Sequence, residues 1–486
     1  MVRSYGHRAT SHRLLHSLTI VLAFAVLSWV WASPVSAQIQ DRSKLVAALD
    51  SAAQAHAADS TVAGVAVAVS RRGDMLLHEG YGKANLEFDV PMPKDAVFEI
   101  GSVTKQFTAA AILQLAEKDS LDLDAPITEY LPDYNTRGHR VTVRHLLHHT
   151  SGIRSYTNTP RFSSLARETL SRDTVLTLMQ QEPFRFAPGA AMSYSNSGYY
   201  LLGQTIEAAS GTSYAAYIEE HLLEPVEMDE THYCDERAVV DGKAQGYSWA
   251  GEEGFQLRKR WAHQTWSYAA GALCSTTGDL VRWLQALHGR EVISDSMYAG
   301  MTTPGRLADG TELRYGMGLA VSETKSHRII GHGGSIDGFV SATAYFPGED
   351  MILVVLQNTR GPQPPSLLTT MLADLVLGPG DEPISSSYEG DLSELTGRYS
   401  GSARGRKLTL QVRAQNGHLL TSEAGSDAEP DTLRHISGPT WQHGSNLYPG
   451  LYGDTHLRFV GADEGVDEIR LDAVYGHYVL RRVGGP

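Results

Sequence analysis

Ser-x-x-Lys, a spacing that can pair a nucleophile with a base, occurs at Ser102–Lys105 and again at Ser322–Lys325. The first copy leads into an apolar, Ala-rich run over residues 106–116, which predicts a buried helix with Lys105 one turn from Ser102. Burial lowers the pKa of a lysine, and a neutral amine can accept the proton of a serine hydroxyl. Lys325 lies in a predicted polar turn, where it stays charged. Ser102 and Lys105 are therefore the favoured nucleophile and base.

Two further patterns also occur twice: Tyr-x-Asn at Tyr156–Asn158 and Tyr194–Asn196, and His-x-Gly at His78–Gly80 and His332–Gly334. Tyr194 follows a Pro-Gly turn and precedes an apolar run, which predicts a rigid loop against the start of a helix. The second His-x-Gly lies among further glycines just before a predicted strand. Glycines beside a strand edge let a ligand approach the backbone. Tyr194, Asn196 and His332 are therefore the favoured copies.

Each pattern alone has a plain structural interpretation: a surface helix turn, a core tyrosine or a loop histidine. Their joint occurrence, in fitting contexts and behind a predicted export signal, favours an active site. At this point the chain resembles the penicillin-recognising serine hydrolases, which include class C β-lactamases, D-alanyl-D-alanine carboxypeptidases, D-aminopeptidases and esterases. The resemblance spans roughly residues 45–377 and includes the segments 146–152 and 331–335.

The resemblance implies a role for each motif residue. Ser102 would be the nucleophile and Lys105 its base. Tyr194 would relay protons to the leaving group and then activate the deacylating water, while Asn196 would hydrogen-bond the substrate. The backbone N–H groups of Ser102 and Ser335 would form the oxyanion hole.

The third motif departs from the pattern of most β-lactamases in the family. They carry Lys where this chain has His332, and a permanent charge suits a β-lactam carboxylate better than an imidazole. His332 would orient Tyr194 or meet a substrate carboxylate, with Gly333, Gly334 and Ser335 binding substrate. Efficient β-lactam hydrolysis is not expected, and slow turnover or simple acylation stays open.

Composition excludes several other classes of function. The chain has 486 residues, 42% of them hydrophobic, which predicts a globular protein with a large core. A formal net charge of −14 disfavours nucleic acid as a partner. Neither HExxH nor a GxxxxGK[ST] loop is present, so we expect no metal and no cofactor. His145, His148 and His149 come nearest to a ligand cluster, but no carboxylate accompanies them.

The N-terminus predicts export. Three arginines and no acidic residue precede the apolar stretch Leu18–Ala32, and the small-residue site Val35-Ser36-Ala37 follows it. This is the pattern of a signal peptide over residues 1–37, which places the mature protein in the periplasm or outside the cell. A retained anchor is the less favoured alternative, because the stretch is shorter than a membrane span. In that oxidising location Cys234 and Cys274 are expected to form a disulfide, with two buried thiols as the alternative.

Two folded domains are expected. Strands predicted near both ends of residues 38–378, with helices between them, indicate an α+β domain whose antiparallel sheet joins its two ends. The resemblance implies a β-lactamase-like fold for it. A Gly-, Pro- and Ser-rich linker over residues 379–387 leads to residues 388–486, where apolar residues alternate around the Asn416-Gly417 turn. This second domain resembles lipocalin-like β barrels, and we expect it to shape the entrance of the active site.

The function expected from these features is that of an extracytoplasmic serine hydrolase. It would act through an acyl-enzyme on D-amino-acid peptides, amides or esters. The alternative is a protein that binds penicillin or peptidoglycan without turnover, but such a relative would be expected to have lost Ser102, Lys105 or Tyr194.

Overall fold

The computed structural model describes ten stretches of the chain. These are residues 41–166, 168–235, 237–257, 263–324, 327–378, 387–403, 406–427, 429–443, 455–462 and 465–483. The predicted signal peptide, Lys325 and residues 379–386 of the predicted linker lie outside them. Residues 41–57 are helical. By its contacts the chain divides into residues 1–51 and 52–486, and the sheets, barrel and site belong to the second unit. No helix within the described stretches is long and apolar enough to cross a bilayer.

A seven-stranded antiparallel sheet forms the centre of the first domain, in the order β10-β11-β12-β13-β1-β2-β3. Its strands are β1 (Gly64–Arg71), β2 (Asp74–Asn85), β3 (Val90–Pro91), β10 (Ala320–Thr324), β11 (His327–Ile336), β12 (Phe339–Phe346) and β13 (Met351–Gln357). As the sequence predicts, the sheet joins the two ends of the domain, because β1 pairs with β13. From Gly64 to Ser70, β1 is an unbroken run of small and apolar residues because α9 and α11 cover this part of the sheet.

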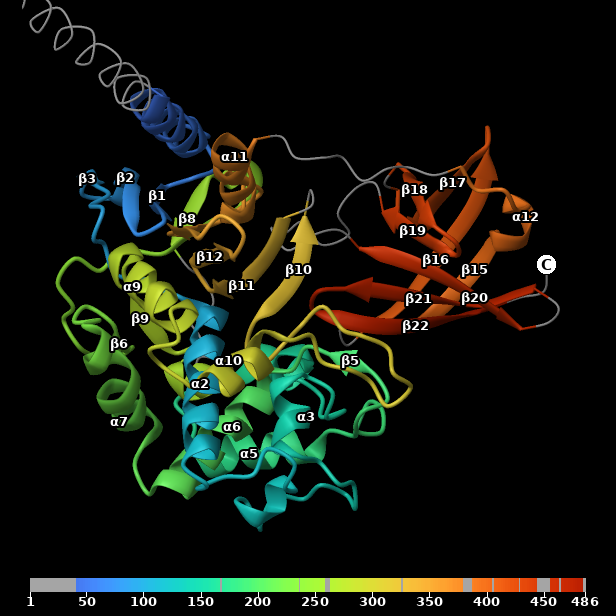
Figure 1. Ribbon diagram of the computed structural model, residues 1–486, viewed down its shortest axis with the longest axis horizontal. Coiled ribbons are helices and arrows are strands. Elements are labelled where there is room, and N and C mark those ends of the chain that lie inside the picture. Colours follow the sequence, from blue (N-terminus) through green and yellow to red (C-terminus); the bar gives the residue numbers. More distant parts are fainter. Residues whose placement is uncertain are drawn as a thin grey trace, which may run out of the picture. The chain divides into compact units, whose positions relative to one another are not determined.

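The helices lie between and around these strands (Figure 1). They are α2 (Thr104–Glu117), α3 (Val143–Leu147), α4 (Pro160–Leu165), α5 (Arg172–Gln181), α6 (Asn196–Ser210), α7 (Tyr214–Ile218), α8 (Gln264–Ser267), α9 (Thr277–His288), α10 (Asp295–Thr302) and α11 (Pro365–Leu377). Shorter helical turns are η1 (Gly101–Val103), η2 (Ile127–Glu129), η3 (Tyr156–Asn158), η4 (Glu219–Leu223), η5 (Glu224–Val226), η6 (Gly251–Glu253) and η7 (Tyr268–Ala270). Two small sheets join β4 (Phe98–Glu99), β9 (Leu273–Ser275) and β6 (His232–Tyr233), and β14 (Thr359–Arg360), β7 (Tyr247–Trp249) and β8 (Phe255–Leu257).

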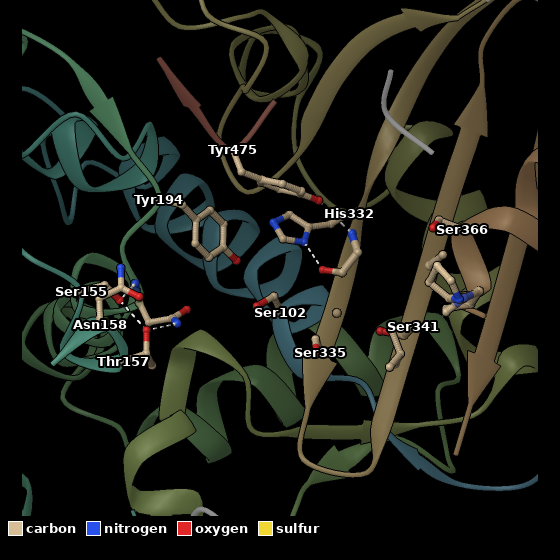
Figure 2. Close-up of a pocket in the computed structure, with 17 residues that line it drawn as sticks. Ser102, Ser155, Thr157, Asn158, Tyr194, His332, Ser335, Ser341, Ser366 and Tyr475 are labelled. Carbon is tan, nitrogen blue, oxygen red and sulfur yellow. Dashed lines mark hydrogen bonds between the residues drawn. The ribbon is translucent and has the colours of Figure 1, made fainter. Parts of the chain in front are cut away.

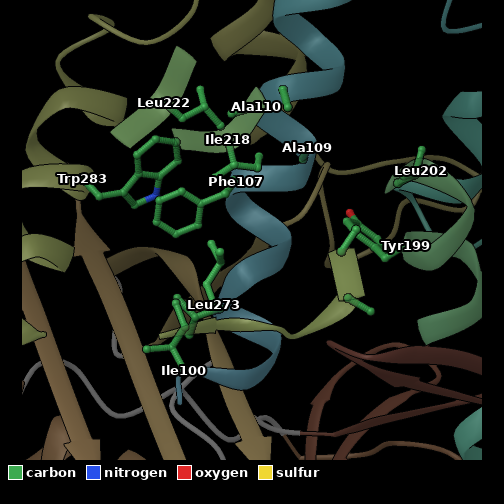
Figure 3. Close-up of a cluster of buried hydrophobic side chains, with 14 of the residues drawn as sticks. Ile100, Phe107, Ala109, Ala110, Tyr199, Leu202, Ile218, Leu222, Leu273 and Trp283 are labelled. Atoms are coloured by element: carbon green, nitrogen blue, oxygen red, sulfur yellow. The ribbon is translucent and has the colours of Figure 1, made fainter. Parts of the chain in front are cut away.

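Helix α2 is buried on nearly all sides, which explains why its sequence shows no polar stripe. The ring of Phe107 stacks on Trp283 of α9 with centroids 4.0 Å apart (Figure 3). On another side α2 packs against α6. This packing fixes the first turn of α2, which carries Lys105, relative to the sheet.

One local prediction is wrong. The second Ser-x-x-Lys copy does not begin in a polar turn, because Ser322 lies within β10, opposite Ile329, and is buried. Its polar neighbours suggest a turn, but strand pairing with β11 decides the local structure.

Cys234 and Cys274 form a disulfide, with Cα atoms 5.3 Å apart. Cys274 lies on β9 and the backbone N–H of Cys234 donates to the carbonyl of Ala272, so the bond lies inside a small sheet. Both cysteines are buried beside Val97.

The second domain is an eight-stranded antiparallel barrel. Its elements are α12 (Leu392–Leu395), β15 (Gly397–Ala403), β16 (Arg406–Gln415), β17 (His418–Glu423), β18 (Asp431–Ser437), β19 (Thr440–His443), β20 (His456–Ala462), β21 (Gly465–Ala473) and β22 (Gly476–Arg482). Pairing of β15 with β22 closes the barrel, and alternate side chains such as Leu408, Leu410 and Val412 fill it. Asn416 and Gly417 both have positive φ, as the predicted hairpin turn requires. The short strand β5 (Met192–Ser193) of the first domain adds to β22.

Candidate active site

Ser102 lies on the turn η1, directly before α2. The turn packs closely against β11, and two glycines make this approach sterically possible. Gly101 has φ +52°, and a Cβ on it would lie 3.0 Å from the backbone nitrogen of Ser335. A Cβ on Gly334 would lie 2.0 Å from the carbonyl oxygen of Ile100. The glycines therefore bring the nucleophile's turn against the strand that carries Ser335.

Lys105 lies beneath Ser102 and is fully buried. Its Nζ lies 3.1 Å from Ser102 Oγ, 2.8 Å from Asn196 Oδ1 and 2.6 Å from the carbonyl oxygen of Ala270. In the part of the chain that the structure describes, no carboxylate pairs with it, and burial holds its pKa well below 10.5. The two carbonyl oxygens can only accept hydrogen bonds, so a neutral amine directs both N–H groups to them. Its lone pair then faces the hydroxyl of Ser102.

Tyr194 lies between β5 and the start of α6, on a loop that its neighbours hold rigidly. The side chain of Ser195 caps α6, and the backbone N–H of Ser195 donates to Nδ1 of His149 (3.2 Å). The ring of His149 packs on Tyr194 with centroids 4.3 Å apart. Lys105 Nζ lies 4.9 Å from the centre of the Tyr194 ring. Figure 2 shows the hydroxyl of Tyr194 pointing toward Ser102.

Asn196 lies at the first position of α6, and protein groups hold its side chain at both ends. Its Oδ1 accepts from Lys105, and its Nδ2 donates to Thr157 Oγ1 at 3.2 Å. Its backbone N–H donates to Ser155 Oγ at 3.1 Å. The family resemblance implies a substrate contact for Asn196. The structure adds a second task, which is to hold the base in place.

His332 is buried in β11, and protein groups engage both of its ring nitrogens. Nδ1 donates to the carbonyl oxygen of Gly333 at 2.5 Å, so Nε2 is the acceptor for the hydroxyl of Tyr315 at 3.0 Å. Burial lowers the pKa of His332 to about 3, so the ring is neutral near pH 7. This geometry leaves no nitrogen of His332 for a substrate carboxylate. It fits the expectation that His332 orients its neighbours, and its ring lies 6.0 Å from that of Tyr194.

The edge of β11 beside Ser102 presents backbone groups. β10 pairs with β11 only as far as Gly331, so the following residues have no strand partner on that side in the described chain. The N–H of His332 donates to Thr343 on β12, whereas that of Gly333 points the opposite way, to Tyr475. Because the N–H groups of alternate residues in a strand point to the same edge, the N–H of Ser335 points to the same edge of β11 as that of Gly333. It is thus on the side of Ser102, where an oxyanion hole needs it.

Two cavities meet at Ser102. The first, which we call the Tyr194 cavity, has a volume of about 440 Å³. It is lined by Ser102, Ser155, Thr157, Asn158, Tyr194, Asn196, His332, Gly333, Gly334, Ser335, Val340, Ser341, Ala342, Pro364, Pro365, Ser366 and Tyr475. The second, which we call the Trp266 cavity, has a volume of about 330 Å³. It shares Ser102, Thr157, Asn196 and Ser335 with the first but not Tyr194, and its wall includes the rings of Tyr156, Phe162 and Trp266.

The structure brings together the favoured copies of the three motifs, and it adds some residues that the motifs do not indicate. The less favoured Tyr156–Asn158 copy forms a wall of the site, although the hydroxyl of Tyr156 is bound to the carbonyl of Trp266. His149, Tyr315 and Tyr475 surround Tyr194. No short motif marks these three, although His149 lies within the segment 146–152 that carries the resemblance.

The three neighbouring histidines have separate surroundings rather than a shared site. His145 Nδ1 accepts from the backbone N–H of Thr142 in a capping box at the start of α3. His149 accepts from Ser195, and His148 is buried. Within the stretches of chain that are described, no three His, Cys, Asp or Glu side chains gather into an arrangement that could hold a metal ion.

Comparison with known proteins agrees with this geometry. The family model described as Beta-lactamase matches residues 49–377. The chain is 29% identical over 306 residues to penicillin-binding protein 4* of Bacillus subtilis, covering 60% of this chain and 67% of that protein. It is also 29% identical over 300 residues to a D-aminopeptidase of Gluconobacter oxydans, covering 61% of this chain and 55% of that protein. The chain thus spans between about half and two thirds of the length of these relatives.

Solved structures match over a larger share of their length. The octameric penicillin-binding protein homologue from Pyrococcus abyssi has a TM-score of 0.60 at 25% identity, covering 89% of this chain and 99% of that one. The D-stereospecific amidohydrolase from Streptomyces sp. has a TM-score of 0.58 at 26% identity, covering 68% of this chain and 97% of that one.

Proposed function

We propose a function that follows from the family and from the site. The chain belongs to the Beta-lactamase family of serine hydrolases and is homologous to D-aminopeptidases. It hydrolyses the amides and short peptides of D-amino acids through an acyl-enzyme on Ser102. The observation that carries this proposal is the buried Lys105 Nζ, 3.1 Å from Ser102 Oγ, with no carboxylate partner among the described residues. A lysine in this setting is a base rather than a surface cation.

Acylation begins with proton transfer from Ser102 Oγ to the neutral amine of Lys105. Ser102 Oγ then bonds to the substrate carbonyl carbon, and the N–H groups of Ser102 and Ser335 stabilise the negative oxygen, a contribution of about 3 kcal/mol per donor. Tyr194 gives its phenolic proton to the leaving nitrogen as the C–N bond breaks, and Lys105 returns a proton to Tyr194.

Deacylation uses the same groups in reverse. Water attacks the ester carbon and its proton passes by way of Tyr194 to Lys105. Lys105 then gives a proton to Ser102 Oγ as the bond between that oxygen and the acyl carbon breaks. The products are a carboxylic acid and an amine, and the enzyme returns to its starting state.

The two cavities have different tasks because only one of them contains the proton donor. The leaving group must lie beside Tyr194 to be protonated, so it occupies the Tyr194 cavity. The acyl group then occupies the Trp266 cavity, whose aromatic wall suits an apolar side chain.

The charge of the Tyr194 cavity favours a neutral leaving group. Among the described residues that line this cavity, none is Lys or Arg, and His332 is neutral near pH 7. A leaving group that keeps a carboxylate, as in a carboxypeptidase substrate or an opened β-lactam, finds no cation there. Ammonia or a neutral amine as leaving group needs no cation. The names of the relatives, D-aminopeptidase and D-stereospecific amidohydrolase, support the D configuration.

We also propose that the protein acts outside the cytoplasm after removal of residues 1–37. The apolar stretch and the small-residue cleavage site support this. The disulfide between Cys234 and Cys274 is consistent with an oxidising compartment.

The test is hydrolysis of D-phenylalanine amide and its L enantiomer by wild type and by Ser102→Ala, with intact mass measured during turnover. We expect hydrolysis of the D form and a transient adduct on wild type only. Activity retained by a folded Ser102→Ala variant contradicts the proposal. An adduct that forms but never decays favours the alternative of a binding protein.

A further inference from the structure

Tyr475 belongs to the barrel but lies in the Tyr194 cavity. It occupies the turn between β21 and β22. Directly after it, Gly476 and His477 pair with Ser193 and Met192, the two residues of β5. Tyr194 directly follows Ser193 in the chain. Strand pairing therefore connects the backbone beside Tyr475 to the backbone beside Tyr194.

The side chain of Tyr475 completes this connection. Its ring lies 5.3 Å from that of Tyr194, at an angle of 79° between planes, and 5.4 Å from that of His332 (Figure 2). Its hydroxyl oxygen accepts the N–H of Gly333 at 3.2 Å. The barrel thus supplies one wall of the cavity beside the tyrosine that protonates the leaving group.

The hydrogen bond to Gly333 closes the edge of β11. An extended substrate whose carbonyl oxygen meets the N–H of Ser335 would place its next outward-facing group two residues along the strand, at Gly333. There the N–H is bound to Tyr475, and the carbonyl oxygen accepts from Nδ1 of His332. The N–H of Gly333 has a single hydrogen, which Tyr475 already accepts, so a peptide chain cannot complete its backbone pairing past the leaving nitrogen.

We propose that Tyr475 is a specificity-determining residue that limits the length of the leaving group, and that it also positions Tyr194. The proposal rests on the function proposed above. The enzyme therefore prefers substrates that release ammonia or a single residue over those that release a longer peptide, and the barrel sets this preference. Tyr475 donates no proton to the substrate and is not a catalytic residue.

Two substitutions separate the two tasks. Tyr475→Phe removes the hydroxyl and frees the N–H of Gly333, but keeps the ring beside Tyr194. Tyr475→Leu removes the aromatic wall as well. Tyr399→Phe is the matched control, because it also removes one tyrosine hydroxyl from the barrel. That hydroxyl donates to the carbonyl of Leu395, and Tyr399 lines neither of the two cavities at Ser102.

The assay compares kcat/KM for D-Phe-NH2, D-Phe-Gly-NH2, D-Phe-Gly-Gly-NH2 and D-Phe-Gly-Gly-Gly-NH2, whose leaving groups differ in length but carry no carboxylate. In Tyr475→Phe we expect the ratio of the longest peptide to the amide to rise about fivefold, the factor expected of one hydrogen bond. In Tyr475→Leu we expect kcat for the amide to fall and its pH profile to change, because Tyr194 loses its support. Tyr399→Phe should match wild type in both measurements.

A second series distinguishes the failure of this inference from the failure of the proposed function. Acetyl esters of glycolamide, glycolyl-glycinamide and glycolyl-glycyl-glycinamide present leaving groups of increasing length, and acetylation of Ser102 is read by intact mass. Ratios that are equal in wild type and in Tyr475→Phe, with either series, overturn the role of Tyr475 alone. If the esters acylate Ser102 but no D-amide is cleaved, the proposed substrate class is wrong and the ester ratios decide on Tyr475. If neither series reacts, both proposals fail.

Discussion

A single methyl group at position 334 tests how the nucleophile is held in place. A Cβ on Gly334 would lie 2.0 Å from the carbonyl oxygen of Ile100 and 2.2 Å from Ser341 Oγ. The Ser341 hydroxyl itself donates to that carbonyl at 2.8 Å, so both contacts belong to one packed layer. Moving from 2.0 Å to an ordinary contact at 3.4 Å requires Ile100 and β11 to separate by about 1.4 Å.

This separation acts directly on the oxyanion hole. Ile100 is two residues before Ser102, whereas Ser335 follows Gly334 on β11, so the Gly334→Ala substitution drives the two N–H donors apart. Loss of one such donor costs about 10²- to 10³-fold in rate. We therefore expect acylation of Ser102 to fall at least about 100-fold. Overpacking should also lower the free energy of unfolding by about 1–3 kcal/mol.

The assay is the rate of acetyl-Ser102 formation from an activated acetyl ester, measured by intact mass, together with thermal unfolding. Gly300→Ala is the control, since Gly300 lies in α10 and a Cβ there meets nothing within 4 Å. The control should acylate at the wild-type rate. A folded Gly334→Ala variant that acylates within about threefold of wild type would refute the reasoning, because the turn and the strand would then not be rigidly coupled.

The remaining predictions concern the buried base, the signal peptide and the disulfide. Measured from about pH 5 to about pH 11, acylation should reach its plateau well below pH 10.5, because burial lowers the pKa of Lys105; a rate that still rises near pH 10.5 would count against Lys105 as base. His332, with a pKa of about 3, should add no second step in this range. Below pH 10.5 the unfolded chain binds a proton at Lys105 that the folded chain lacks. The free energy of unfolding should therefore fall by about 1.4 kcal/mol per pH unit as the pH drops from 10.5 toward the pKa of Lys105 in the folded protein. Lys105→Met should remove this slope. The mass of the exported protein should show that residues 1–37 are absent. Reduction of the Cys234–Cys274 bond, which spans 40 residues, should lower the free energy of unfolding by about 4 kcal/mol. A thermal midpoint that reductant does not move contradicts the stabilising role of this bond.

Much of the site can be read from local sequence because the relevant geometry is local. Ser102 and Lys105 are three residues apart at the start of a helix, and helical geometry alone places them on one face. A neighbouring turn and neighbouring glycines favour Tyr194 and His332 over their second copies, and both line the Tyr194 cavity. The strands β1 and β13 are predictable because a strand buried on both faces is an apolar run in any sequence.

The β-lactamase-like fold and the lipocalin-like barrel follow from resemblance and alternation rather than from local rules, and the order of the strands comes from the structure. The closest approach in the site was not foreseeable at all. That Gly334 must be glycine follows from the carbonyl of Ile100, which is 234 residues earlier in the chain, and only the packed structure shows the contact.

What the sequence by itself determined is therefore the set of reactive groups and the local elements that carry them. Only the tertiary structure decided their chemical state and their limits. Burial lowers the pKa of Lys105, and Asn196 and Ala270, 91 and 165 residues away, fix the position of its amine. Tyr475 enters the site because β22 pairs with β5 across the two domains. Burial and contact between distant segments depend on packing, and packing leaves no periodic signal in the chain.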